Sequence, residues 1–173
     1  MCSLVQLFAQ LRLRVNESKS AVAPAQERDF LGFCLWTWKG TLRLGVSSKA
    51  LRAMKDRIRA ITRRVRGRSL HQVVLDLRSY LLGWWNYFQI SESPRLAREL
   101  DGWIRHRLRA YQLKQWRNRR TIYRELVARG LTTWDAFRVA RCEGRWWRSS
   151  GLFLNRALPN LFFDGLGVPR LTQ

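Results

Sequence analysis

The sequence predicts a mainly helical α+β protein, in which a short helix and a small β-hairpin precede a multi-helix bundle. From residue 47 onward, apolar residues recur at the spacing of amphipathic helices. Before that point, two short apolar segments flank a turn that contains glycine. A hydrophobic content of 46% is sufficient for a packed core and argues against disorder, despite the high charge of the chain.

The first 46 residues are expected to contain the strands. Apolar residues at helical spacing predict a short helix over residues 3–12, and the alternating segment LRLRV (11–15) predicts a half-buried strand. The segments FLGFCLW (30–36) and TLRLGV (41–46) predict a β-hairpin, with Gly40 in the turn between them.

The remainder is expected to be helical. Ser47 or Ser48 can cap a first helix, and Ser69 can cap a second helix over residues 70–88, which has the widest apolar stripe. Further helices are predicted over residues 95–117, 120–129 and 132–142. The tail, rich in Gly and Pro, is expected to form one or two short helical turns.

The charge of the chain points to a polyanionic partner. Lys and Arg number 33 against 12 Asp and Glu, which gives a formal charge of +21. Such an excess destabilises a compact state unless an anion relieves the repulsion, and it exceeds what solubility requires. Most of the cations are Arg, whose planar guanidinium suits phosphate and stacks on bases. Nucleic acid is therefore the preferred partner.

Several other classes are disfavoured. Three widely spaced Cys residues, without a CxxC motif, support neither a disulfide framework nor a zinc site. No apolar run reaches the roughly 18–20 residues of a membrane span, and no clean secretory signal is present. We therefore expect a cytoplasmic protein with no membrane partner and no metal site.

The candidate RNA-binding residues lie in segments without acidic residues. One group follows a single stripe of the helix that starts near residue 48 and continues through RRVRGR (63–68). A second group lies in the long helix and just after it, and a third consists of the Trp-Trp pair at residues 146–147 and the Arg that follows it. The set is Arg52, Lys55, Arg59, Arg63, Arg64, Arg66, Arg68, Arg107, Lys114, Arg117, Arg119, Arg120, Trp146, Trp147 and Arg148.

The pattern leaves some of these roles open. Arg98, Arg105 and Arg109 are expected to lie opposite the apolar stripe of the long helix, with Arg98 and Arg105 paired with Asp101 in solvent. Arg107 and Lys114 lie on the apolar side, so they either extend past the edge of the core or face a second charged surface.

The aromatic residues divide in the same way. Trp84, Trp85 and Phe88 are expected to pack in the core. Trp116, Trp146 and Trp147 lie beside Arg residues in the sequence and fit either core packing or stacking on unpaired bases.

Several segments together resemble the carboxy-terminal part of group II intron-encoded reverse transcriptase/maturases. LRLRVNESKSAVA (11–23) resembles the late palm motif, and DFLGFCLW (29–36) resembles the β-hairpin motif that follows it. LRSYLLGWWNYF (77–88), RLARELDGWIRHRLR (95–109), QWRNRRTIYRELVARGL (115–131) and GRWWRSSGLFLNRALPN (144–160) are similar to the thumb and maturase region. The resemblance covers nearly the whole chain, with the motifs in the order of the family.

The resemblance implies a division into a palm remnant (1–46), a helical thumb (47–117) and a maturase-specific segment (118–173). It implies that Lys19 lies near the phosphates of an incoming nucleotide and that Asn16 sets the turn before it. It also implies a primer-gripping hairpin, to which Phe30, Leu31, Gly32 and Phe33 belong.

The chain departs from the family where catalysis would occur. Polymerisation needs paired carboxylates that hold two metal ions, and the family supplies them upstream of the late palm motif. This sequence has no adjacent pair of acidic residues. We therefore expect no catalytic residues and no cofactor in this chain, since Mg²⁺ would belong to the missing palm. The position of Met1 suggests a truncated, split or incompletely defined gene.

Three functions remain open. The first is an RNA-binding maturase fragment that promotes folding and splicing of a group II intron RNA and is not catalytic alone. The second is part of an RNA-directed DNA polymerase, active only with a complementing palm and fingers chain. The third is a general basic RNA- or DNA-binding protein. The expected partners are group II intron RNA, with target DNA or an RNA–DNA duplex and a complementing polymerase chain as further partners.

Overall fold

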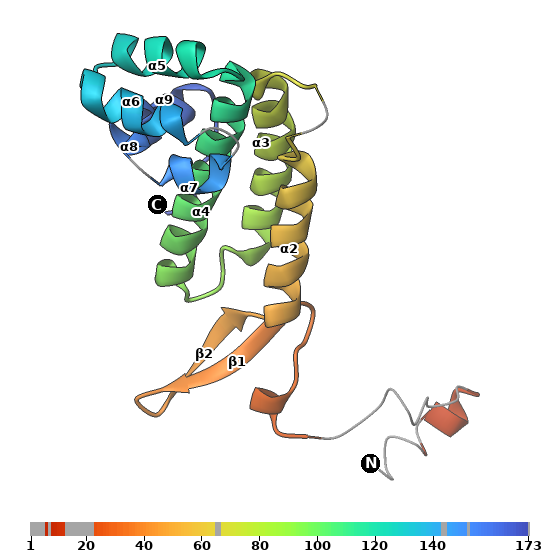
Figure 1. Cartoon of the computed structure of the whole chain (residues 1–173). Coiled ribbons are helices and arrows are strands. Elements are labelled where there is room, and N and C mark those ends of the chain that lie inside the picture. The colour runs from red at the N-terminus through yellow and green to blue at the C-terminus, as the bar shows by residue number, and fades with distance from the viewer. Residues whose placement is uncertain are drawn as a thin grey trace.

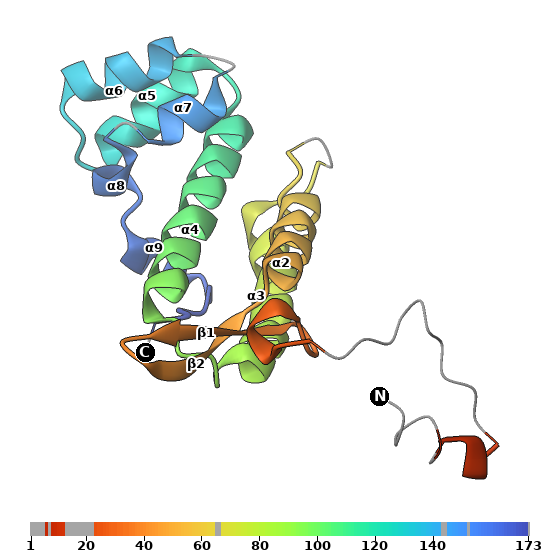
Figure 2. The ribbon, with the colours of Figure 1, turned by 90° about the horizontal axis from the view of Figure 1, so that it is seen from below.

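The structure is a computed structural model that describes residues 6, 8–12, 23–64, 67–142, 145–151 and 153–172. It is mainly helical, with one small antiparallel hairpin, which confirms the predicted fold class. The hairpin lies at one end of α2, α3 and α4, and the shorter helices α5 to α9 gather around the other half of α4 (Figure 1). Figure 2 shows the same body from below, with the hairpin across its end.

The N-terminal helix is described only at residues 6 and 8–10, which are helical as predicted. The strand predicted from residue 11 is wrong for Leu11 and Arg12, which lie in a turn. Arg12 has a φ of 55°, and its amide donates to the carbonyl of Ala9 at 3.0 Å, so the chain turns back here. Residues 13–15 lie outside the described residues.

The hairpin consists of β1 (Phe33–Trp38) and β2 (Thr41–Val46), in the register Trp38↔Thr41. The first strand begins and ends later than predicted. Leu31 and Gly32 have φ values of 50° and 82°, which are incompatible with an extended strand. The turn needs only Lys39 and Gly40, both at positive φ, which is the two-residue turn that matches strand twist. Gly40 therefore lies in the turn, as predicted.

Two serines start the long helices α2 (Ser48–Ile61) and α3 (Leu70–Phe88). The Ser47 hydroxyl accepts from the amide of Ala50 at 3.2 Å. Ser69 forms a capping box with Gln72, in which each side chain accepts from the backbone amide of the other residue. Both caps follow the sequence prediction, and α3 has the predicted bounds.

The other helices begin and end within two residues of the predicted positions. They are α4 (Pro94–Trp116), α5 (Arg119–Ala128) and α6 (Thr133–Arg141), and Gly130 at a φ of 84° separates α5 from α6. The tail forms α7 (Trp146–Ser150), α8 (Leu154–Ala157) and α9 (Asn160–Gly165), more than the one or two turns expected. A 3₁₀ turn, η1 (Ala25–Glu27), precedes the hairpin.

One hydrophobic core joins α2, α3 and α4 to the tail. It includes Met54 and Ile58 of α2, Leu77 of α3, Leu108 of α4 and Phe163 of α9. Trp84 and Trp85 are half-buried and pack against this core, and Phe88 is buried, which confirms their predicted role.

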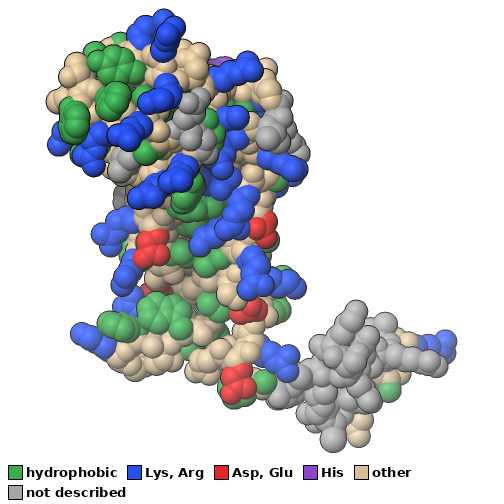
Figure 3. Space-filling model, in the orientation of Figure 1, with side chains coloured by type: hydrophobic (Ala, Val, Ile, Leu, Met, Phe, Trp, Pro, Cys, Tyr) green, Lys and Arg blue, Asp and Glu red, His purple; other side chains and the backbone are tan. Residues whose placement is uncertain are grey.

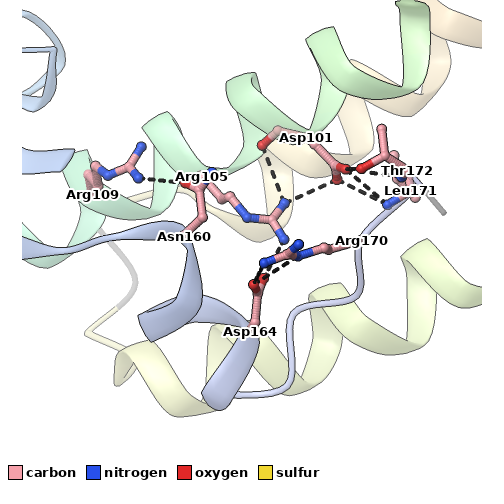
Figure 4. A network of polar contacts seen from close by, with 8 residues as sticks. All are labelled: Asp101, Arg105, Arg109, Asn160, Asp164, Arg170, Leu171 and Thr172. Atoms are coloured by element: carbon pink, nitrogen blue, oxygen red, sulfur yellow. Dashed lines mark hydrogen bonds and ion pairs between the residues drawn. The ribbon is translucent and has the colours of Figure 1, made fainter. Parts of the chain in front are cut away.

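The expectation that Arg105 and Arg109 lie in solvent is wrong, because the tail folds back over that face of α4. Their side chains are only 2% and 5% exposed. Arg105 donates to Asp101 at 3.0 Å, as predicted, and also to Asp164 of α9 at 2.6 Å (Figure 4). Arg98 is exposed and has no ion pair among the described residues.

The same network of polar contacts also binds the residues near the C-terminus. The Asp101 carboxylate accepts from the backbone amides of Leu171 and Thr172 at 3.1 Å, and Asp164 pairs with Arg170 (Figure 4). Burial alone would raise the pKa of Asp164, but the hydrogen bonds and charges of Arg170 and Arg105 outweigh it and lower that pKa. The carboxylate is therefore ionised in the folded protein at neutral pH.

Candidate nucleic-acid interface

Seven cationic side chains form a continuous surface along α2, the α2–α3 connection and one side of α4. We call this surface the basic band. On the face shown in Figure 3, Lys and Arg side chains extend over the whole helical body, with few acidic residues among them. The residues of the basic band are Arg52, Lys55, Arg59, Arg64, Arg68, Arg107 and Lys114.

Trp103 of α4 lies within the band and has two guanidinium groups close to its ring. The carbon centres of Arg59 and Arg107 lie 5.7 Å and 5.3 Å from the ring centroid. The Arg107 Nε donates to the hydroxyl of Thr62 at 2.8 Å, and that hydroxyl donates to the carbonyl of Ile58. These contacts join Arg107 of α4 to the end of α2, and the cation–π contact with Trp103 adds to them.

The electrostatics of Arg107 indicate charge that is not compensated. Burial, followed by the nearby positive charges of Arg64 and Arg59, lowers the pKa of Arg107 to about 10. Among the described residues, no carboxylate pairs with this guanidinium. Arg107 remains charged at neutral pH, and the repulsion within the cluster would be relieved by a bound anion.

Two hollows lie along the band. Arg52, Lys55 and Arg59 line one of about 550 Å³, whose acidic residue, Asp56, pairs with Arg59 at 2.6 Å. The other, of about 420 Å³, is lined by residues that include Arg64, Arg68 and Lys114. Concave surfaces with several cations suit the phosphates of a folded strand, because more than one phosphate can be contacted together.

Arg68 differs from the rest of the band because it also supports the connection between α2 and α3. Its side chain pairs with Asp76 at 2.7 Å. Its backbone carbonyl accepts from the hydroxyl of Tyr111 at 2.6 Å and from Gln115 at 2.8 Å. Burial raises the pKa of Tyr111 despite the opposing charge of Arg68, so the hydroxyl keeps the proton that it donates.

The third predicted group surrounds α7. Trp146 is half-buried and packs against the core, and the Lys114 ammonium lies 5.7 Å from the centroid of its ring. Trp147 is 44% exposed and packs edge-on against His106 of α4, with ring centroids 4.0 Å apart. Arg148 is exposed beside them. The Trp147 side chain is thus accessible for stacking, whereas Trp146 contributes mainly to packing.

The Arg residues around the start of α5 form a separate exposed group. Arg117 lies between α4 and α5 at a φ of 61°, and Arg119 and Arg120 occupy the first turn of α5. None of the three forms an ion pair among the described residues. Cations at a helix N-terminus oppose the helix dipole, which an anion there would relieve. Trp116, just before them, is buried, with the Arg129 guanidinium 5.0 Å from its ring centroid.

The remaining predicted residues fall elsewhere. Arg63 is exposed near the end of α2. Asn16, Lys19 and Arg66 lie outside the described residues.

In the predicted primer-gripping segment, Phe30 and Leu31 are 76% and 67% exposed. Phe33 packs on Phe88 of α3, with ring centroids 5.0 Å apart. A Cβ at Gly32 would lie 3.2 Å from the Phe88 ring, and Gly32 has a positive φ, so this position favours glycine. The segment therefore has one packed side and one exposed side.

Neither Trp103 nor Thr62 is among the binding residues predicted from the sequence. Both are needed to position Arg107. The spacing of Trp103 and Arg107, four residues apart on one helix, was a usable signal, because such side chains are neighbours. The contact with Thr62 joins two helices and has no such local signal.

Within the described part of the chain, no group of three or more His, Cys, Asp or Glu residues is arranged to hold a metal ion. A search of the same residues finds no helix with the length and apolar character needed to cross a membrane.

A comparison with known protein families finds a match within the helical part of the chain. Residues 51–129 match the family model of the group II intron maturase-specific domain. No curated protein matches the sequence. The matched residues run from α2 to the end of α5 and contain the whole basic band. They begin inside the segment that was assigned above to the thumb. The division between residues 117 and 118 therefore stays a prediction. This match supports a group II intron maturase carboxy-terminal region over residues 51–129.

Proposed function

We propose that this chain binds group II intron RNA through the basic band, promotes the folding and splicing of that RNA, and is not catalytic alone. The family match supports a maturase role. The observation that carries the RNA-binding part is the cluster of Arg59, Arg64 and Arg107 around Trp103, in which positive charges are held together without a carboxylate on Arg107. A polyanion compensates such a cluster, and structured RNA presents phosphates and unpaired bases together.

A splicing assay tests this proposal. A precursor transcript with a group II intron from the same genome is incubated at a magnesium concentration too low for efficient self-splicing. We expect the protein to increase the yield of ligated exons, and the triple change of Arg59, Arg64 and Arg107 of the basic band to Gln to reduce both this yield and RNA affinity. A protein that binds the transcript without changing the yield would contradict the splicing role.

One observation favours a second candidate, a polymerase part that needs a separate palm and fingers chain. Phe30, Leu31 and Trp38 of the hairpin region are more than half exposed, as expected for a surface that another chain covers. In that case the metal-holding carboxylates would belong to the other chain. Primer extension by a mixture of the two chains, but by neither alone, would support this candidate; no extension by the mixture would contradict it.

A further inference from the structure

Another polar cavity lies apart from the basic band, between α4, α7 and the segment that joins α8 to α9. Its volume is about 550 Å³, within the range of small-molecule sites. Gly102, His106 and Arg109 of α4 line one side of it. Ser150 and Gly151 at the end of α7, Asn155 of α8 and Asn160 of α9 line the other.

Arg109 gives this cavity an uncompensated charge. Its side chain is buried, and its hydrogen bonds go to neutral acceptors: Nε donates to the carbonyl of Leu158 at 2.9 Å, and Nη2 donates to the Asn160 amide oxygen at 2.7 Å. Among the described residues it has no ion pair, whereas Arg105, one turn earlier, has two. A buried cation without a counter-charge favours an anionic ligand.

The wall beside Arg109 supplies neutral polar groups. The His106 Nε2 lies 2.9 Å from the hydroxyl of Ser150, which donates to the carbonyl of Trp147 at 2.7 Å. Burial is the largest influence on the pKa of His106 and lowers it; the charges of Arg109 and Arg107 add to this effect, and the bond to Trp147 opposes it. His106 is therefore neutral at pH 7 and suits hydrogen bonding rather than ion pairing.

The residues at the edge of the cavity can form hydrogen bonds with a heterocycle. Asn155 is exposed and makes no hydrogen bond among the described residues, and the amide nitrogen of Asn160 is left available while its oxygen accepts from Arg109. Amide groups carry both donors and acceptors, as the edges of bases do. The cavity thus combines one cation with several neutral hydrogen-bonding groups.

A glycine in a helix interior keeps the cavity open. Gly102 lies within α4, where glycine costs roughly 0.5–1 kcal/mol relative to alanine. A Cβ at Gly102 would meet no atom within 4 Å, so a larger side chain would extend into open space at the cavity. Helix packing does not require glycine here.

We propose that this cavity binds one nucleoside monophosphate unit, with its phosphate on Arg109 and its base or ribose against Asn155 and Asn160. This inference rests on the proposed function, because an unpaired nucleotide of bound intron RNA would supply the unit. A free nucleotide has the same chemistry and is the other source.

The two histidines of the chain allow a direct test in the full-length protein. His106 lines the cavity, and His71 is exposed on α3. Adenosine 5′-monophosphate is titrated while the imidazole proton resonances of both are followed by NMR. We expect a saturable shift at His106 that exceeds any shift at His71, and a weaker response to adenosine or inorganic phosphate alone. No saturable shift at His106 would overturn the proposal.

Two matched variants separate a specific effect from a change in the fold. Gly102→Leu places a side chain in the cavity, and Gly83→Leu makes the same change inside α3, where a Cβ also meets no atom within 4 Å. Both changes favour the helix. We expect Gly102→Leu to raise the nucleotide Kd by at least about tenfold, and Gly83→Leu to change it by less than about twofold. Equal affinities of the two variants would overturn the proposal.

Intron RNA distinguishes the two sources of the nucleotide. If the unit comes from RNA, Gly102→Leu weakens intron binding and adenosine 5′-monophosphate competes with the RNA. If intron affinity is unchanged while nucleotide binding is lost, the ligand is a free nucleotide. Failure of the chain to bind any intron RNA would refute the proposed function, whereas failure of the nucleotide to shift His106 while RNA binds would refute only this inference.

Discussion

At the scale of single residues, Arg107 joins the packing of α2 on α4 to the charge of the basic band. Its guanidinium lies over Trp103, donates to Thr62, and has Arg59 and Arg64 nearby. The sequence left open whether Arg107 extends past the core edge or faces a charged surface. In the structure both descriptions apply, because the Arg107 side chain is half-buried and its guanidinium belongs to the basic band.

Arg107→Gln should weaken RNA binding while leaving the fold intact. The amide of Gln can still approach Thr62, but the positive charge is lost, so the slope of log affinity against log salt should become shallower by about 1. Arg98→Gln, an exposed position on the same helix, is the matched control. Filter binding over a range of salt concentrations measures both slopes. An unchanged slope for Arg107→Gln would show that Arg107 is not part of the RNA interface.

Trp84→Ala should lower stability rather than RNA affinity. The ring packs on Phe88 with a centroid distance of 4.6 Å and borders the core. Because Trp84 is half-buried, we expect a loss near the lower end of the roughly 3–5 kcal/mol typical of large aromatic truncations. Urea unfolding measures this loss. Normal stability with lost RNA binding would identify Trp84 as a base-stacking residue instead.

At the scale of elements, local signals predicted most helices and failed where distant segments meet. The bounds of α3 follow from its cap at Ser69 and its apolar stripe, both readable within one segment. The hairpin turn is shorter than predicted, because β1 extends to Trp38 and Lys39 adopts a positive φ that its residue type does not suggest. The burial of Arg105 depends on Asp164, 59 residues away, and no pattern within α4 could reveal it.

The tail network should make stability depend on pH. The pKa of Asp164 is lowered in the folded state, so its contribution is fully present above the unfolded pKa of about 4 and is lost as pH falls through the folded value. Asp164→Asn should therefore lower the melting temperature at neutral pH, with the difference from wild type shrinking in acid. Thermal melts across this range measure it, and a difference independent of pH would contradict the assigned role.

At the scale of the whole molecule, the formal charge of the chain is +21, and Lys and Arg side chains extend over a helical body that also has a well-packed core. Composition predicted the polyanionic partner class, and the periodicity predicted the core. The three-dimensional arrangement adds that seven of the predicted cations form one band, while Arg117, Arg119 and Arg120 lie apart from it at the start of α5. Which cations share a surface depends on how α2 packs near α4, and that is a tertiary property.

The most direct test of this account is the affinity of the purified chain for a group II intron transcript, measured against salt in the presence of excess tRNA. We predict saturable binding that survives the competitor, with a slope of log affinity against log salt of roughly −6 to −7 if about eight phosphates are neutralised. Binding that excess tRNA abolishes would indicate a general basic protein, and no binding even at low salt would contradict the account.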